Sequence, residues 1–222
     1  MRIVLAARID GFAAERSFRI YEYYNEPRPY DTEMTLLLKI ANWIDAVNRR
    51  IGQLMFLLLL AMILIGIYNA TVRYLGGFIG ANLSSNAYLE LQWYFFSAIF
   101  MLGAAYTLQR NGHVRVDVFQ SRLSEKAKAW IDLIGIVVFM IPFCAIVFWL
   151  SLPWVLNSWH LLEVSSDPGG LPRYPIKTVI PLAFVLLLLQ GISQIIKAVA
   201  VIRGIRPSLY EAELKDEKEH TL

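Results

Sequence analysis

The sequence predicts an all-α integral membrane protein with four transmembrane helices, and three observations support this fold class. Hydrophobic residues make up 57% of the 222 residues and charged residues only 18%, whereas about a quarter of a soluble domain is charged. The apolar residues fall in four long blocks without a charge near the centre, each close to the roughly 20 residues that a bilayer core requires. Lys and Arg gather beside these blocks, which is typical of membrane proteins.

Two charged tails are predicted to flank the membrane domain. Residues 1–33 mix positive and negative charges and lack an apolar core followed by a small-residue cleavage site, so we interpret them as a cytoplasmic N-terminal tail and not a secretory signal. Met34 is an alternative start to Met1. Residues 34–206 form the predicted membrane domain, and residues 207–222 form a charged cytoplasmic C-terminal tail.

An amphipathic segment, residues 34–50, precedes the first apolar block. Leu37, Ile40 and Ile44 recur at helical spacing, while Asp45 falls on the other side. This pattern predicts an interfacial helix leading into the membrane. The alternative is that the segment is a plain cytoplasmic extension of the first span.

The apolar blocks define the predicted spans, which are residues 51–72, 88–108, 133–154 and 178–196. Glycines follow the first span and predict a short loop there. Ser124 is the expected N-cap of the helix that leads into the third span. Pro142 is expected to kink that span, because a proline removes one backbone hydrogen bond and clashes with the preceding turn. Turn residues dominate the connection 160–177.

The distribution of basic residues predicts the orientation. The connection between the second and third spans, 110–130, holds five Lys or Arg. The connections on the opposite side hold only Arg73, Arg173 and Lys177. Because positive residues favour the cytoplasmic side, we expect both termini in the cytoplasm.

The types of ionisable residue exclude several kinds of membrane chemistry. The three histidines, His113, His160 and His220, lie outside the predicted spans, so no pair of facing helices can hold a haem through histidine. Cys144 is the single cysteine, which leaves no CxxC pair for thiol exchange. We therefore expect no enzyme activity, no cofactor and no metal.

The charged residues with the most distinctive positions lie at the ends of the spans. Arg73 leaves the first span and Glu90 enters the second, so they can pair with each other or with another subunit. The alternative is that each side chain extends into the lipid headgroups. Trp93 is an expected interface anchor. Gly103 and its small neighbours are expected to let another helix approach closely.

The segment after the second span has a basic start and an alternating continuation. Arg110 begins it, and His113, Arg115 and Asp117 share one side of an extended segment. A metal site there would lack ligands, because only one histidine is present. We interpret the segment as a polar surface against lipid headgroups or a partner.

Several short motifs occur together in the order and positions of a known family. They are Arg73-Tyr74, Glu90-Leu91, Gly103-Ala104-Ala105 and Arg110-Asn111-Gly112-His113-Val114-Arg115-Val116-Asp117. In these motifs the chain resembles the small membrane subunit, DctQ-like, of tripartite ATP-independent periplasmic (TRAP) transporters, over residues 40–203. The long N-terminal tail and the extended connection 160–177 depart from the family pattern.

The resemblance implies a scaffold in the bacterial inner membrane. Such a subunit supports a large many-span subunit that carries substrate and sodium, and it helps to dock a periplasmic substrate-binding protein. The substrate class it implies is an organic anion, a dicarboxylate or a 2-oxo acid. A membrane anchor or assembly subunit of another complex, without a transport role, is the alternative, since it would share the uncharged spans.

Overall fold

The computed structural model describes residues 31–80, 85–110, 112 and 123–204. The chain divides into two units, Met1–Leu36 and Leu37–Leu222. The first unit contributes only residues 31–36 to the described part, and the description below concerns the second. The described elements of secondary structure are helices, apart from one isolated β-bridge, and four helical stretches are long and apolar enough to cross a membrane. The predicted all-α fold with four spans is confirmed.

Helix α2, Asp31–Ile79, runs for 49 residues without a break. At 1.5 Å per residue it is about 73 Å long, far more than the roughly 30 Å of a bilayer core. The predicted loop beginning at Gly76 is wrong, because the helix continues through Gly76 and Gly77 and ends before Gly80, which has a φ of +70°. Glycine permits a helix end without requiring one, and of these three glycines only Gly80 adopts the left-handed conformation that commonly closes a helix.

The amphipathic segment 34–50 is continuous with the first span. This continuity matches the alternative interpretation, in which the segment extends the span directly. An interfacial position for it stays a prediction. Its apolar residues Leu37, Ile40 and Trp43 are exposed, whereas Ala41 and Ile44 are buried. The apolar residues of this segment are therefore only partly covered by the rest of the described chain.

Helix α3, Asn86–Gln109, corresponds to the predicted second span. It begins at Ser85, whose hydroxyl accepts a hydrogen bond from the backbone N–H of Ala87 at 3.3 Å. It ends at Arg110, whose backbone N–H donates to the carbonyl of Tyr106 at 3.0 Å. These hydrogen bonds pair backbone groups at both ends of the helix, where N–H and C=O groups otherwise lack a partner.

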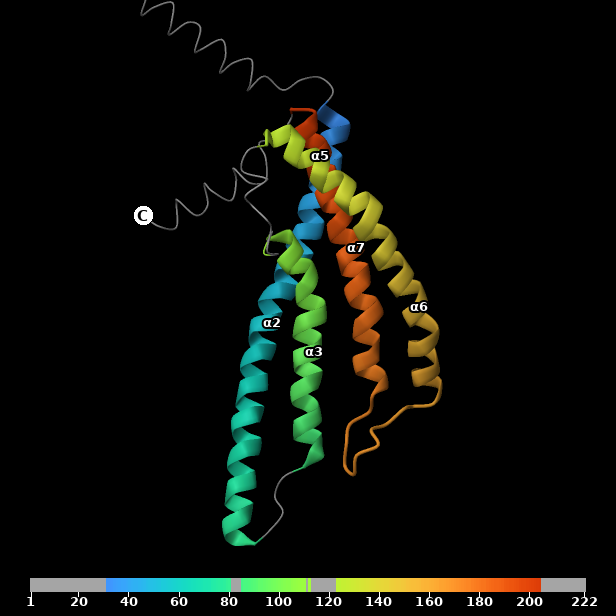
Figure 1. Ribbon diagram of the computed structural model, residues 1–222. Helices are drawn as coiled ribbons and strands as arrows, with labels where there is room; N and C mark the ends of the chain where they lie inside the picture. The colour runs from blue at the N-terminus through green and yellow to red at the C-terminus, as the bar shows by residue number, and fades with distance from the viewer. Residues whose placement is uncertain (1–30, 81–84, 111, 113–122, 205–222) are drawn as a thin grey trace, which may run out of the picture. The chain divides into compact units, whose positions relative to one another are not determined.

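The third span is longer than predicted and changes its winding. It comprises α5, Glu125–Gly135, a π-helical turn η1, Ile136–Met140, and α6, Ile141–His160. The prediction for Ser124 is confirmed, because its hydroxyl accepts from Ala127 N–H at 3.4 Å. The π-helical turn ends two residues before Pro142, where one backbone donor is missing. Figure 1 shows the helical path turning between α5 and α6.

Helix α7, Tyr174–Ile202, is the central helix of the bundle. In its most apolar window 39% of the residues are buried, against 11% for each of the other three spans. It runs between α3 and α6 (Figure 1) and also contacts α5. Ala198 and Val201 of α7 form a small core with Ala129 of α5. The outer faces of the other helices expose large apolar side chains, which suits contact with lipid or with another membrane subunit.

Candidate functional site

The connection between α6 and α7, residues 161–173, is an ordered hairpin-like loop. Val164 and Pro172 form an antiparallel bridge. The backbone N–H of Ser165 donates to the carbonyl of Leu171 at 3.1 Å, and that of Arg173 donates to the carbonyl of Glu163 at 2.8 Å. These bonds fix the shape of the predicted turn-rich connection, which we call the 161–173 loop.

Glu90 of α3 attaches this loop to the bundle. Its side chain is 3% exposed. Its carboxylate accepts hydrogen bonds from the backbone N–H of Leu171 and from the hydroxyl of Ser165. A Cβ atom at Gly170 would lie 2.8 Å from Oε1 of Glu90, so the absence of a side chain at Gly170 lets the loop approach the carboxylate.

Two further side chains of α3 bind the same loop. The amide of Asn86 donates to the carbonyl of Pro168 at 3.1 Å, and the hydroxyl of Tyr94 donates to the carbonyl of Pro172 at 2.9 Å. Asn86, Glu90 and Tyr94 are spaced four residues apart, which places them on one face of a helix. This face of α3 therefore holds the loop along its length.

Glu163 and Lys177 form an ion pair at the base of the loop. Ser158 donates to Oε2 of Glu163 at 2.7 Å, and the ammonium of Lys177 lies 4.1 Å from the ring centroid of Trp154. The Lys177 ammonium, and then the Ser158 hydroxyl, hold the pKa of the Glu163 carboxyl below its ordinary value. The pair therefore joins the loop to the ends of both helices that it connects.

The loop presents an apolar outer side. Leu161, Leu162 and Val164 are 69%, 62% and 65% exposed. Leu162 adopts a φ of +45°, which is uncommon for a residue with a side chain. An exposed apolar cluster on a fixed backbone is a surface suited to protein–protein contact.

A second polar cluster lies where α2 meets the other end of α7. Asp45 of α2 forms an ion pair with Lys197 of α7. Oδ1 of Asp45 also accepts from Ser193 at 2.8 Å and from Gln190 at 3.1 Å. Asn48 donates to Oε1 of Gln190 at 2.6 Å. We call these five residues the Asp45 cluster.

The Asp45 cluster corrects the assignment of Asp45 to the outward polar side of an amphipathic helix. Asp45 points into the bundle, and Lys197 is 6% exposed. Helix α3 joins the same region, because Gln109 donates to the carbonyl of Asp45 at 3.1 Å and Gln194 donates to the carbonyl of Leu108 at 2.8 Å. The polar side of this helix therefore serves packing within the chain.

The residues predicted as a pair at the span ends do not bind each other. Glu90 binds the 161–173 loop, and no Arg73–Glu90 ion pair occurs among the described residues. Arg73 is exposed on α2 and lines a cavity of about 560 Å³ with Asn69 and Gln92. Pairing within the chain is wrong, because the 161–173 loop supplies the donors to the Glu90 carboxylate; pairing with another subunit stays a prediction.

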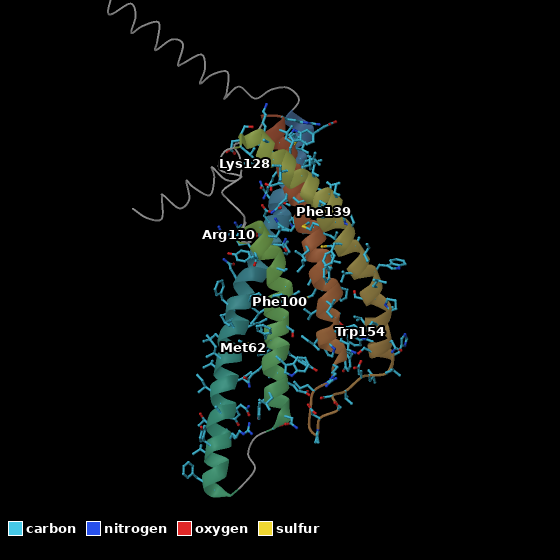
Figure 2. The ribbon with its side chains drawn as sticks, viewed as in Figure 1. Met62, Phe100, Arg110, Lys128, Phe139 and Trp154 are labelled. Atoms are coloured by element: carbon cyan, nitrogen blue, oxygen red, sulfur yellow. The ribbon has the colours of Figure 1, made fainter. Side chains whose placement is uncertain are left out.

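The other predicted residues are dispersed. Trp93 is 42% exposed and lies against Tyr94, with ring centroids 4.4 Å apart. At Gly103 an added Cβ would meet no atom of the described residues within 4 Å. Arg110 lies at the end of α3 (Figure 2), where Nε donates to the hydroxyl of Tyr106 at 3.3 Å. His113 and Asp117 lie outside the described residues.

Close helix contact occurs instead at a glycine that the sequence analysis did not single out. A Cβ at Gly52 of α2 would lie 2.4 Å from the ring of Tyr106 of α3. A signal for the Asp45 cluster was also present in the sequence. Gln190, Ser193 and Lys197 follow the spacing i, i+3, i+7, which gives an otherwise apolar helix one polar stripe.

The comparisons identify a family over most of the membrane domain. A family model described as "Tripartite ATP-independent periplasmic transporters, DctQ component" matches residues 62–201, more than half of the 222-residue chain. No curated protein and no solved structure matches the chain. The match includes α3, the 161–173 loop and nearly all of α7. Together with the four apolar helices, it establishes that this chain belongs to the DctQ family, the small membrane subunits of TRAP transporters.

Proposed function

We propose that this chain is a scaffold subunit of a TRAP-type secondary transporter in a bacterial inner membrane, with both termini in the cytoplasm. It supports a large many-span subunit that takes up an organic anion, a dicarboxylate or a 2-oxo acid, with a sodium gradient. It also helps a periplasmic substrate-binding protein to dock. The family match over residues 62–201 is the observation that carries this proposal.

The buried charged side chains are bound within the chain, which favours a scaffold role over a role in carrying substrate. Among the described residues, Glu90 and Lys197 are the buried charged side chains, and each is bound within the chain. A transport path through a membrane uses ionisable groups that face a cavity or a substrate. Glu90 and Lys197 serve packing instead, so we assign substrate and ion binding to the large subunit.

The 161–173 loop supports the docking role. In the proposed orientation it lies on the periplasmic side, held by Glu90, Asn86 and Tyr94 of α3. A surface that is fixed before binding loses little conformational entropy when a partner arrives. The exposed side chains Leu162 and Val164 then supply the apolar contact.

Deletion of this chain tests the proposal. We expect a strain that keeps the large subunit and the binding protein to lose uptake, and expression of the full chain in trans to restore it. Purification of the tagged chain in mild detergent should recover the large subunit in stoichiometric amount. Normal uptake in the deletion strain, or recovery with an enzyme complex instead, would refute the scaffold role in favour of a membrane anchor.

The docking role has its own test at Val164. We expect Val164→Asp to weaken binding of the substrate-binding protein to the assembled membrane complex about tenfold, because a carboxylate replaces an apolar contact. Ser166→Asp adds the same charge to an exposed polar position of the loop and serves as the control. Equal losses in both variants would attribute the effect to charge and would contradict an apolar docking surface.

A further inference from the structure

The end of α2 that leads to α3 presents a face built mainly of small residues. Gly66, Ala70, Arg73 and Gly77 follow the spacing i, i+4, i+7, i+11, which places them on one side of a helix. Ala70 and Arg73 are exposed, and an added Cβ at Gly77 would meet no described atom within 4 Å. Figure 1 shows α2 continuing past the start of α3, so α3 does not cover this face to its end. We call these four residues the Gly66 face.

A cavity of about 560 Å³ lies beside this face, between α2 and α3. Arg73, Asn69 and Gln92 line it with polar side chains. Asn69 is 7% exposed, and its Oδ1 is buried without a hydrogen-bond partner among the described residues. Because Asn69 precedes Arg73 by four residues, it lies about 6 Å deeper along the helix. The cavity is therefore polar both at the end of the span and one turn within it.

The guanidinium of Arg73 has no counter-ion in the described part of the chain. Glu90 is bound to the 161–173 loop, Glu163 is paired with a lysine, and Asp167 makes no ion pair there. Residues 81–84, which follow α2, include no Asp or Glu. Charged groups at membrane depth usually pair with an opposite charge, so the carboxylate for Arg73 comes from another molecule.

A phospholipid matches this cavity poorly. Its phosphate would meet Arg73 at the level of the headgroups, and its acyl chains would then lie against Asn69. An amide finds no hydrogen-bond partner in hydrocarbon, and burying it there is costly. A transmembrane helix of another subunit carries polar side chains at both depths. The small side chains of Gly66 and Ala70 also let a helix backbone approach closely.

We propose that the Gly66 face packs against one transmembrane helix of the large subunit, and that an Asp or Glu of that helix pairs with Arg73 in the cavity. This inference rests on the proposed function, because it takes the large subunit as the partner. It adds the face of contact and the chemistry of recognition, a carboxylate at the outer end of a span. Tyr74 and Phe78 are 77% and 87% exposed beside the face and extend the contact.

Photo-cross-linking tests the face and distinguishes protein from lipid. The full chain is expressed with the large subunit and carries p-benzoylphenylalanine at position 70 or at position 71. Thr71 is also exposed, but it lies about 100° around the helix from Ala70 and outside the Gly66 face. We expect irradiated membranes to give a product with the large subunit from position 70 and to lose most of it from position 71. Products with lipid alone at position 70, or equal yields from both positions, would overturn the proposal.

Substitution of Arg73 tests the charge. We expect Arg73→Gln to weaken the association of the purified subunits about tenfold, the loss expected for a hydrogen-bonded charged group. Arg73→Lys keeps the charge and should retain most of the affinity. Arg203→Gln removes an exposed arginine at the far end of α7 and is the control. Undiminished association in Arg73→Gln, or an equal loss in Arg203→Gln, would contradict a specific pair.

A charge exchange identifies the partner residue. The cross-linked peptide of the large subunit supplies the candidate Asp or Glu, which is replaced by Arg in combination with Arg73→Glu. Each single change should weaken assembly and the combination should restore it, whereas failure of every such combination would overturn the pairing. The unaltered chain separates the two levels of the argument. If it recovers the large subunit but position 70 does not cross-link to it, only this inference fails. If it recovers no large subunit, the proposed function fails as well.

Discussion

The carboxylate of Glu90 lies inside the molecule, where it binds a loop and not a second charged side chain. Leu171 N–H and the Ser165 hydroxyl are its hydrogen-bond donors, and Gly170 leaves the space that the approach requires. Hydrogen bonds to a charged acceptor are stronger than those between neutral groups. Glu90 is therefore one of the side chains that order the 161–173 loop, together with Asn86 and Tyr94.

We expect Glu90→Gln to loosen the 161–173 loop while the four spans remain folded. Glutamine keeps the shape of the side chain but replaces one acceptor oxygen with an NH₂ group, so at least one of the two donors loses its partner. Hydrogen exchange should become faster in residues 161–173 and stay unchanged in α7. Asp167→Asn removes a charge from the exposed part of the loop and is the matched control. Unchanged exchange in Glu90→Gln would contradict the assigned role.

Glu163 makes the base of the loop sensitive to acid. The Lys177 ammonium and the Ser158 hydroxyl lower the pKa of Glu163 from its ordinary value of 4.5. A carboxyl with a lowered pKa in the folded state stabilises that state above 4.5, and the contribution is lost as the pH falls through the folded pKa. We expect faster exchange at residues 158–173 in acid, after correction for the intrinsic rate. Glu163→Gln should reduce this dependence, and an undiminished dependence would assign it to another group.

At the scale of the elements, α2 and α3 make a close contact at Gly52. A Cβ at Gly52 would meet the ring of Tyr106 at 2.4 Å, whereas a Cβ at Gly103 would meet nothing within 4 Å. The contact is with the base of the Tyr106 ring and not with the far end of a flexible side chain, so relieving it requires a shift of this side chain or of the helices. The two glycines thus offer a matched pair of substitutions.

We expect Gly52→Ala to lower the free energy of unfolding by about 1–3 kcal/mol, the usual cost of overpacking. Gly103→Ala should be neutral, or stabilising by up to about 1 kcal/mol, because alanine is the better helix former. Thermal unfolding in detergent measures both. Equal destabilisation by the two substitutions would show that a general loss of glycine, and not the Tyr106 contact, is responsible.

The Asp45 cluster joins the long helix α2 to the central helix α7. Breaking a buried ion pair by removing one partner typically costs about 3–5 kcal/mol, because the remaining charge is left unpaired. We expect Asp45→Asn and Lys197→Met each to destabilise the chain strongly. The double variant should be more stable than the sum of the two losses predicts. Additive losses in this double-mutant cycle would show that the two residues do not act as a pair.

Features that depend on local sequence were predicted well, whereas contacts between distant helices were not. Span positions follow from composition alone, since an apolar block of sufficient length has one stable place in a bilayer. The N-cap at Ser124 is equally local. The Asp45–Lys197 pair and the Glu90–loop attachment join residues 152 and 81 positions apart. Such contacts depend on how the helices pack, which the pattern within one helix does not specify.

At the scale of the whole molecule, α7 organises the bundle and the two polar sites lie near its opposite ends. The Asp45 cluster includes Lys197 close to the end of α7, while Arg173 and Lys177 lie at its start. The side of the membrane on which each site lies follows from the orientation of the chain. The proposed orientation places the 161–173 loop outside the cell and the start of α5 inside.

We expect cysteine labelling in intact cells to confirm this orientation. Cys144 is 2% exposed, and its replacement by alanine gives a background without a thiol. In that background Ser166→Cys should react with a membrane-impermeant maleimide from outside, whereas Leu123→Cys should react only after the membrane is permeabilised. Both positions are exposed in the structure, so accessibility within the protein does not distinguish them.

The physical basis of this prediction is the imbalance of charge. Lys126 and Lys128 lie three and five residues after position 123, and positive residues near a span are retained on the cytoplasmic side. The connections on the other side hold only Arg73, Arg173 and Lys177, against five Lys or Arg in the connection 110–130. The reverse labelling pattern would show that the chain has the opposite orientation in the membrane. It would place the Asp45 cluster on the periplasmic side and leave the 161–173 loop unable to contact a periplasmic protein.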